Sequence, residues 1–379
     1  MKFMVLKNGT ILNENFKLIK SDIEIKEDKI TRIDTKIDNN TDLIDVTGMY
    51  VLPGFIDTHM HGAYGERFND SDPDIDKITT FLATKGITTI AATTASDDFN
   101  HLLHQFDDIV SAIENGNCGA KIAGIHAEGP FINKKLKGAM TEEYIINPTK
   151  EKIEQMLCHC KNYLKIITIA PEIENAKEAI TLFVNNDVKV SIGHTNATLA
   201  EAEDGIKWGA SQSTHTFNAM RPYNHREPGV LGSVLTNPKI KCEMICDFVH
   251  LHPKTIEFIY QIKGVDNINI VSDSGHTAGT NLTEFMVSGV MRYVKDGIVC
   301  LADGTIAGST KTLLEGVQNL VSIGIPLEDV AKMASLNPAK SLGIDCETGT
   351  ITVGKFADIV VLDKDLQVKY TFVNGKLFK

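Results

Sequence analysis

The chain has 379 residues, of which 42% are hydrophobic and 23% charged, proportions that are typical of a globular enzyme with a sizeable core. Its formal net charge of −11 argues against a general nucleic-acid-binding surface, and no apolar stretch approaches the roughly 20 residues that a membrane-spanning helix needs. The start of the chain does not resemble a signal peptide and the seven cysteines form no CxxC pair, so the sequence predicts a cytoplasmic protein with no membrane partner.

Both ends of the chain show short strand patterns separated by turn residues. At the N-terminal end we expect strands at 3–7, 21–25 and 29–34, with turns at Asn8-Gly9 and Glu27-Asp28. At the C-terminal end we expect strands at 350–353, 358–362 and 368–373, with turns at Gly354-Lys355 and Asn374-Gly375. The sequence therefore predicts a small β-sandwich domain that is discontinuous, built from residues 1–50 plus 345–379.

The middle of the chain, residues 51–344, alternates apolar strands with helical patterns. The eight expected strands are 51–59, 87–94, 121–128, 164–171, 188–194, 211–217, 241–247 and 267–273. The clearest helical patterns between them are 75–85, 150–160, 199–208 and 253–263. This count and length predict an α/β protein with a (β/α)8 TIM-type barrel, and a doubly wound open sheet is the alternative.

The most informative local motif is PGFIDTHMHG at 53–62, at the end of the first expected barrel strand. Alternate residues of a strand face the same side, so Asp57, His59 and His61 point together. Two imidazoles that converge at a strand end make half of a metal site, although two separately hydrogen-bonded histidines remain an alternative. Asp57 either orients a ligand histidine or hydrogen-bonds only to the backbone.

Other polar residues stand at the ends of later strands. They are Glu128 after the third strand, His194 and His215 after the fifth and sixth, His250 after the seventh, and Asp273 after the eighth. A barrel brings all its carboxyl strand ends to one face, where barrel active sites lie. Nitrogen and oxygen ligands of this kind suit Zn²⁺, Fe²⁺ or Mn²⁺. His126 faces the same side as Glu128 and either supports a ligand or is structural.

Taken together, the motifs PGFIDTHMHG, HAEGPF, SIGHT, THTFNAM, HREPGV, VHLHP and IAGST resemble the N-acetylglucosamine-6-phosphate deacetylase family of the amidohydrolase superfamily. The similarity runs through nearly the whole chain. HAEGPF together with FNAM and HREPGV is specific to that family, whereas the HxH motif and the strand-end aspartate are shared by the superfamily. The resemblance implies a hydrolase of amino-sugar metabolism that removes the acetyl group from the 2-amino group of a 6-phosphorylated sugar.

The resemblance also implies roles for individual residues in the reaction. Glu128, His194 and His215 would hold the main divalent metal ion, and His59 and His61 a second ion that Glu128 could bridge. One or two ions per chain are therefore expected, as zinc, iron or manganese. Asp273 would take a proton from the attacking water and pass it to the departing amine.

For the substrate, the resemblance implies binding by Asn218, Ala219, Arg226 and His250. Arg226 would hold the phosphate through paired donors, unless Arg226-Glu227 is only a surface ion pair. A partner subunit can complete such a clamp, so a homodimer is expected.

Three positions depart from the family pattern. Met140 stands where a histidine or glutamine helps to hold the substrate, and a thioether cannot donate a hydrogen bond. Phe248 stands where a glycine is usual, and Ser274–Thr277 replace Ala-Met-Arg-Ala. N-acetylgalactosamine-6-phosphate or another acylated amino-sugar phosphate is therefore an alternative substrate. An amidohydrolase acting on a different amide and a scaffold without activity are the more distant alternatives.

Overall fold

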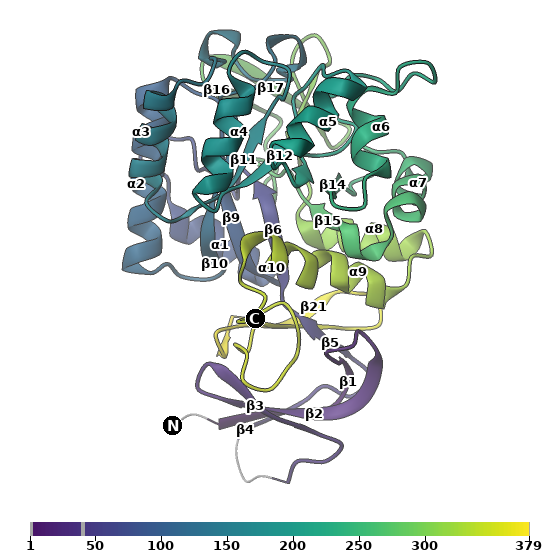
Figure 1. Ribbon diagram of the computed structural model, residues 1–379. Coiled ribbons are helices and arrows are strands. Elements are labelled where there is room, and N and C mark those ends of the chain that lie inside the picture. Colours follow the sequence, from purple (N-terminus) through teal and green to yellow (C-terminus); the bar gives the residue numbers. More distant parts are fainter. Residues whose placement is uncertain (1–2, 39–41, 379) are drawn as a thin grey trace.

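Figure 1 shows the computed structural model, which describes residues 3–38 and 42–378 as a helix-wrapped barrel above a small sheet domain. The first and last described strands both belong to the sheet domain. The α/β class, the barrel and the small domain built from both termini are confirmed, and the open sheet is excluded. The domain boundaries 1–50 plus 345–379 and 51–344 remain a prediction, and residues 1–2, 39–41 and 379 of the first lie outside the described part.

The barrel consists of eight parallel strands that follow one another around the sheet. They are β6 (Phe55–Met60), β9 (Ile87–Ala95), β10 (Lys121–Glu128), β11 (Leu164–Ile169), β12 (Lys189–Ile192), β13 (Gln212–Ser213), β14 (Lys241–Ile245) and β15 (Ile268–Val271). At the carboxyl rim the first and last strands are joined by backbone hydrogen bonds from Asp273 N to His59 O (2.9 Å) and from His61 N to Ser274 O (2.7 Å). The eighth strand end is therefore held beside the first.

Helices surround the barrel. They are α1 (Ile75–Thr84), α2 (Phe99–Asn115), α3 (Lys150–Cys160), α4 (Ala176–Asn185), α5 (Leu199–Lys207), α6 (Gly229–Thr236), α7 (Pro253–Lys263), α8 (Leu313–Ser322), α9 (Leu327–Ala334) and α10 (Leu336–Leu342), with short 3-10 turns η1 (Lys134–Leu136), η2 (Glu142–Tyr144) and η3 (Val265–Asn267). The four expected helices are confirmed to within one residue at each end.

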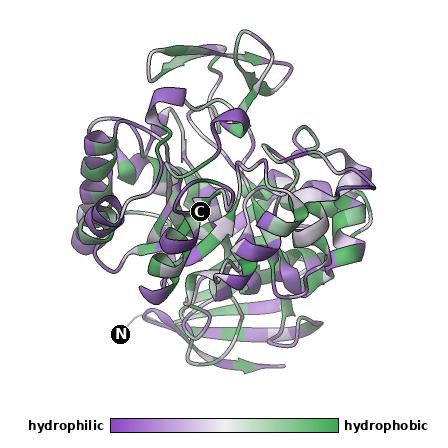
Figure 2. Cartoon of the chain, turned by 45° about the horizontal axis from the view of Figure 1, so that its top comes forward, coloured by the Kyte–Doolittle hydropathy of each residue, from purple (hydrophilic) through white to green (hydrophobic). Residues whose placement is uncertain are grey.

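Local sequence explains both the starts and the orientation of these helices. The Asp74 side chain caps α1 by accepting from Lys77 N, and Thr198 and Glu201 form a capping box at the start of α5. The helices turn hydrophobic residues towards the barrel and largely hydrophilic ones outward (Figure 2). None of the described helices is long and apolar enough to cross a membrane.

The terminal domain is one hydrogen-bonded sheet with the strand order β22-β21-β20-β5-β1-β2-β3, in which β4 pairs with β1. Its strands are β1 (Phe3–Leu12), β2 (Leu18–Lys26), β3 (Lys29–Asp34), β4 (Asp42–Asp45), β5 (Tyr50–Pro53), β20 (Ile359–Leu362), β21 (Val368–Val373) and β22 (Lys376–Leu377). The sheet has its own apolar core, to which Ile23, Val51 and Ile359 contribute. The expected turns at Glu27-Asp28 and Asn374-Gly375 are confirmed.

Three strand predictions and one turn prediction were wrong in detail. Of the expected strand 211–217, only β13 (Gln212–Ser213) is a strand. The expected strand 51–59 is two strands, because β5 pairs with the terminal sheet and β6 with the barrel, and they meet at Gly54. A Cβ at Gly54 would lie 2.2 Å from Thr88 Oγ1, so only glycine fits this crossing. Asn8-Gly9 is not a turn, since β1 continues through it with a register shift and a left-handed Asn8 (φ 64°). Residues 350–353 form no strand.

Two small antiparallel elements at the carboxyl rim were not predicted. A hairpin of β7 (Gly62–Ala63) and β8 (Glu66–Arg67) follows β6. A four-stranded sheet follows β15, made of β16 (Glu284–Val287), β17 (Val290–Lys295), β18 (Ile298–Cys300) and β19 (Ile306–Ser309). This rim sheet lies at the top of Figure 1, and residues from it line the cavity described below.

Candidate metal centre and its cavity

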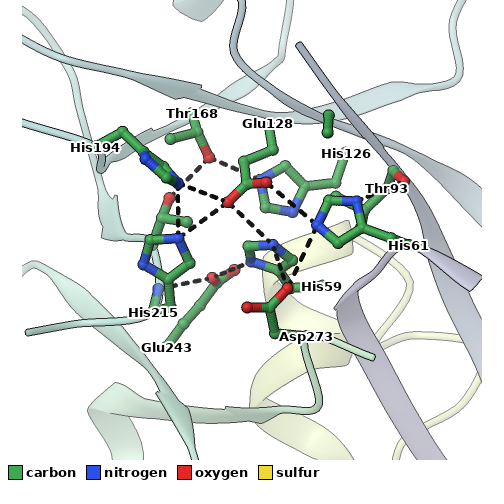
Figure 3. Close-up of polar contacts among 12 residues, drawn as sticks. His59, His61, Thr93, His126, Glu128, Thr168, His194, His215, Glu243 and Asp273 are labelled. Carbon is green, nitrogen blue, oxygen red and sulfur yellow. Dashed lines mark hydrogen bonds and ion pairs between the residues drawn. The ribbon is translucent and has the colours of Figure 1, made fainter. Parts of the chain in front are cut away.

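Six of the sequence-predicted residues meet at the carboxyl end of the barrel (Figure 3). They are His59, His61, Glu128, His194, His215 and Asp273, which come from or follow the first, third, fifth, sixth and eighth barrel strands. His59, Glu128, His194 and His215 are buried. The barrel therefore brings together residues that are more than 200 positions apart in the sequence, as the strand-end argument predicts.

Glu128, His194 and His215 form a compact triangle of possible ligand atoms. Glu128 Oε1 lies 3.0 Å from His194 Nε2 and 2.9 Å from His215 Nε2, and the two nitrogens are 3.1 Å apart. Ligands at about 2.0–2.1 Å from one tetrahedral zinc ion are about 3.3 Å from each other. The triangle thus has nearly the size of one face of a metal coordination shell.

His59 and His61 form a second group with the same glutamate. Glu128 Oε1 lies 3.4 Å from His59 Nε2, and Glu128 Oε2 lies 3.2 Å from His61 Nε2. His59 Nε2 is buried and has no hydrogen-bond partner among the described residues. Each group could hold a metal ion, and Glu128 belongs to both.

Neighbouring acceptors set the orientation of three of these rings. His59 Nδ1 donates to Glu243 Oε2 (2.9 Å), and His61 Nδ1 donates to Thr93 O (3.2 Å). His194 Nδ1 donates to Leu136 O (2.7 Å). In the metal-bound state, a proton on Nδ1 would leave the Nε2 lone pair directed at the cluster, which is the arrangement that metal-ligating histidines need. The donor set therefore fits a divalent metal ion.

Sequence reasoning missed Glu243. This residue is fully buried in β14, where its Oε2 also accepts from His215 N (3.2 Å). The one available signal was an acidic residue between the apolar Cys242 and Met244 of β14, because a carboxylate is buried only where partners compensate for the lost hydration.

His126 has a structural role. Its two ring nitrogens are both occupied, by Thr58 O (2.9 Å) and Thr168 Oγ1 (2.9 Å). Burial and the nearby charge of His59 lower the pKa of His126 to about 4, so the ring is neutral. A third possible ligand group, His59 with His126 and Glu243, is therefore already satisfied by hydrogen bonds.

The carboxylates of the centre are ionised. Burial raises the pKa of Asp273, but the hydrogen bond from His61 and the charges of His59 and His61 outweigh it and hold the pKa at about 2. The same kinds of contact keep the pKa of Glu128 well below its usual value. Burial, in contrast, raises the pKa of Asp57 to about 7. The Asp57 carboxyl group accepts hydrogen bonds from the backbone N–H groups of His59 and Ser272.

Several residues around the centre adopt left-handed backbone conformations although they are not glycine. They are His194 (φ 47°), His215 (φ 28°), Ala219 (φ 49°), Phe248 (φ 64°) and Asp273 (φ 49°). Such conformations cost of the order of 1–3 kcal/mol each and cluster at functional sites. The positive φ of Phe248 also explains why a glycine would suit this position.

The centre opens into a cavity of about 600 Å³. Of the predicted substrate-binding residues, Met140, Asn218, Ala219 and His250 line it. Arg226 does not, because it is exposed on the loop 221–228 outside the lining. Of the other departures from the family pattern, Ser274–Thr277 line the cavity and Phe248 does not.

His250 is held in a fixed orientation. Asp247 Oδ2 accepts from His250 Nδ1 (2.8 Å) and from Ser309 Oγ (2.9 Å). None of the described residues hydrogen-bonds to His250 Nε2, so this atom is available to a ligand. Burial lowers the pKa of His250, but the hydrogen bond and charge of Asp247 raise it by more. The ring is therefore a candidate cationic donor at the cavity wall.

Comparison with known proteins identifies the family of this centre. Residues 50–378 match the model of the amidohydrolase family. The chain belongs to the amidohydrolase family. Within the matched residues lie all six residues of the candidate site, together with Glu243.

Other proteins resemble this amidohydrolase over nearly its whole length. N-acetylglucosamine-6-phosphate deacetylase from Lysinibacillus sphaericus is 33% identical over 377 residues, which cover 99% of this chain and 97% of that protein. N-acetylgalactosamine-6-phosphate deacetylase from Escherichia coli O157:H7 is 31% identical over 329 residues, which cover 86% of this chain and 87% of that protein. A variant of N-acetyl-D-glucosamine-6-phosphate deacetylase from Mycobacterium smegmatis, in complex with N-acetyl-D-glucosamine-6-phosphate, matches with a TM-score of 0.93 at 30% identity over 100% of both chains.

Proposed function

We propose that this amidohydrolase removes the acetyl group from N-acetylglucosamine-6-phosphate, giving glucosamine-6-phosphate and acetate. The observation that carries the proposal is the Glu128–His194–His215 triangle with Asp273 beside it at the floor of the cavity. The names of the similar proteins agree with this activity.

Glu128, His194 and His215 would hold the main divalent ion, and His59 and His61 a second one with Glu128 between them. A bound divalent ion supplies a Lewis acid for the acyl carbonyl and lowers the pKa of water from about 15.7 towards about 7. Zinc, iron and manganese all suit this nitrogen and oxygen set. Glu243, Thr93 and Leu136 keep the rings of His59, His61 and His194 in place.

Asp273 is the proposed catalytic residue. Its Oδ1 lies 3.4 Å from His61 Nε2 and 3.7 Å from His59 Nε2, at the edge of the centre that faces the cavity. The ionised carboxylate accepts a proton from the attacking water and then donates it to the amide nitrogen, because an amine leaves readily only when it is protonated.

His250, Asn218 and Ala219 would bind the sugar phosphate from the walls at the sixth and seventh strands. Met140 closes the cavity as an apolar contact and donates no hydrogen bond. N-acetylgalactosamine-6-phosphate is the second candidate substrate, because a relative that acts on it, by its name, is 31% identical. Relatives from Lysinibacillus sphaericus and Bacillus subtilis that bear the glucosamine name are 33% and 32% identical.

A homodimer is part of the proposal, and Arg226 is the reason. Arg226 is exposed, and Tyr223 on the same loop is 58% exposed, so this loop offers an aromatic and a guanidinium group to a second copy. We expect Arg226 to reach the phosphate in the cavity of the partner. Sedimentation equilibrium that shows a monomer at working concentration would contradict this part.

The proposed compartment is the cytoplasm. All seven cysteines are free, which agrees with a reducing environment. Localisation of a tagged chain by fractionation would test this assignment.

The test of the activity is the release of amine from N-acetylglucosamine-6-phosphate by metal-loaded protein, with the galactosamine epimer and unphosphorylated N-acetylglucosamine alongside. We expect fast release from the first sugar and slow release from the other two. No release from any of the three by protein that holds its metal would refute the proposal.

A further inference from the structure

Two arginines that no motif singled out reach the cavity from the unpredicted rim elements. Arg67 ends the β7–β8 hairpin, and Arg292 lies in β17 of the rim sheet, opposite Phe285 in the strand register. Both arginines and Phe285 line the cavity. These side chains lie next to the first and eighth strands, whereas Asn218, Ala219 and His250 follow the sixth and seventh.

The guanidinium of Arg292 has few partners of its own. Its Nη1 donates to Ala307 O (3.1 Å), its Nε is buried without a partner, and no carboxylate pairs with it among the described residues. Burial and the charge of Arg67 lower the pKa of Arg292 to about 10, which means that its surroundings compensate poorly for its charge. Two residues beyond Ala307, Ser309 N donates to Asp273 O (2.9 Å), so this arginine lies on the Asp273 side of the cavity.

Arg67 is even more deeply buried. Its side chain is 8% exposed, and its nearest carboxylate oxygen, Asp70 Oδ1, is 3.9 Å from Nη1. Asp70 is also paired with His276, through Oδ2 at 3.2 Å from Nε2. One carboxylate therefore pairs with two basic side chains. A separate contact, from Phe68 N to His61 O (3.0 Å), holds the hairpin beside the candidate metal centre.

Neither guanidinium group is closely paired with a carboxylate. Asp70 is the one described carboxylate within 4.0 Å of either group, while Asp97 acts on Arg67, and Asp273 and Glu128 act on Arg292, only from longer distances. Asp303 lies at the rim in an exposed turn. A buried guanidinium group (Arg67) and a partly buried one (Arg292), whose donors are mostly unfilled by the described residues, cost free energy unless an anion binds between them. Guanidinium groups present paired donors that match the oxygens of a phosphate or a carboxylate.

We propose that Arg67 and Arg292 form a second anion-binding subsite in the active cavity, which holds an anionic oxygen group of the substrate. The identity of the substrate in this proposal rests on the proposed function. Arg67 and Arg292 line the cavity of their own chain, whereas Arg226 would reach the cavity of a partner copy. The anionic group is either a carboxylate on the acyl part or the 6-phosphate of the sugar, and the chemistry of recognition is the same for both. A 6-phosphate held by Arg67 and Arg292 would replace its proposed contacts with Asn218, Ala219 and His250, because these lie at the sixth and seventh strands.

The test compares wild type with Arg292→Gln and Arg67→Gln on four substrates. They are the N-acetyl and N-succinyl forms of glucosamine, each with and without the 6-phosphate. Arg292→Lys keeps the charge without the paired donors, and Arg32→Gln removes a surface arginine of the terminal sheet that is 51% exposed. Unfolding temperature and metal content are measured for every variant.

The expected result is a loss of kcat/KM of about 10- to 100-fold in each Gln variant, confined to substrates that carry the recognised anion. A loss confined to the phosphorylated forms assigns the subsite to phosphate. A loss confined to the succinyl forms assigns it to the acyl carboxylate. Equal losses on all four substrates, or none, in variants that fold and hold metal would overturn the proposal, and Arg32→Gln should match wild type throughout.

Binding of inorganic phosphate by calorimetry separates this proposal from the proposed function. We expect wild type to bind phosphate and the Gln variants to bind it about 10- to 100-fold more weakly. An inactive wild type whose phosphate affinity still depends on Arg292 and Arg67 would contradict the deacetylase activity and support the subsite. If the Gln variants keep wild-type phosphate affinity and wild-type discrimination among the four substrates, the subsite is contradicted. That result would not contradict the deacetylase activity.

Discussion

Replacing Glu243 by alanine should weaken both the metal centre and the fold. Glu243 is fully buried and accepts two hydrogen bonds, from His59 Nδ1 (2.9 Å) and from His215 N (3.2 Å). Alanine leaves both donors buried without an acceptor, at about 1–3 kcal/mol each, so the free energy of unfolding should fall by about 2–6 kcal/mol. Loss of an acceptor behind a ligand histidine typically weakens metal affinity by about 10- to 100-fold.

The assay is urea unfolding of metal-free protein together with metal titration against a competing chelator. Glu243→Gln is the matched variant, since its amide oxygen can still accept from His59, and we expect it to lose less than half as much stability. Glu203→Ala, an exposed glutamate on α5, is the control. Wild-type metal affinity and wild-type stability in Glu243→Ala would refute the assignment of Glu243 as the residue that positions His59.

Three further predictions concern the substrate and the metal. Arg226→Ala should raise KM for the phosphorylated sugar by about 10-fold or more and leave the unphosphorylated sugar unaffected; equal losses on both sugars in steady-state kinetics would make Arg226 structural. Since Asp247 raises the pKa of His250, phosphate binding should be complete at low pH and be lost as pH rises through that raised pKa. In Asp247→Asn the loss should begin at lower pH, and a KM–pH profile identical to wild type would contradict this role. Removing the metal with a chelator should abolish activity and lower the unfolding temperature, since a ligand at 100 times its Kd adds about 2.7 kcal/mol; zinc, iron or manganese should restore both, and full activity without metal would contradict the centre.

The barrel was predictable because its signals are local. Each strand is a short apolar run, the helices between them carry an apolar face, and the chain has just enough length for eight units. The candidate metal centre followed from the same pattern, since polar residues directly after buried barrel strands all lie at the carboxyl rim of the barrel. The proximity of His59, Glu128 and Asp273 could therefore be predicted without knowledge of any contact between them.

What the sequence did not reveal depends on contacts between distant segments. The split at Gly54 is decided by Thr88 and by pairing with β20, near the other end of the chain. The strands of the rim sheet are three to six residues long and only partly buried, so they lack the apolar run that marks a barrel strand. Arg292 and Arg67 went unnoticed for that reason, because nothing in the local sequence indicates that these segments fold back over the centre.

The central claim is that Asp273 moves the proton at a metal centre made by Glu128, His194 and His215. The most direct measurement is a single-turnover assay of Asp273→Asn with N-acetylglucosamine-6-phosphate, with metal content and sugar binding measured on the same sample. We predict bound metal, bound sugar and release of glucosamine-6-phosphate slowed by at least about 100-fold, as for the loss of a general acid–base. Near-normal release by a metal-loaded variant would contradict the account.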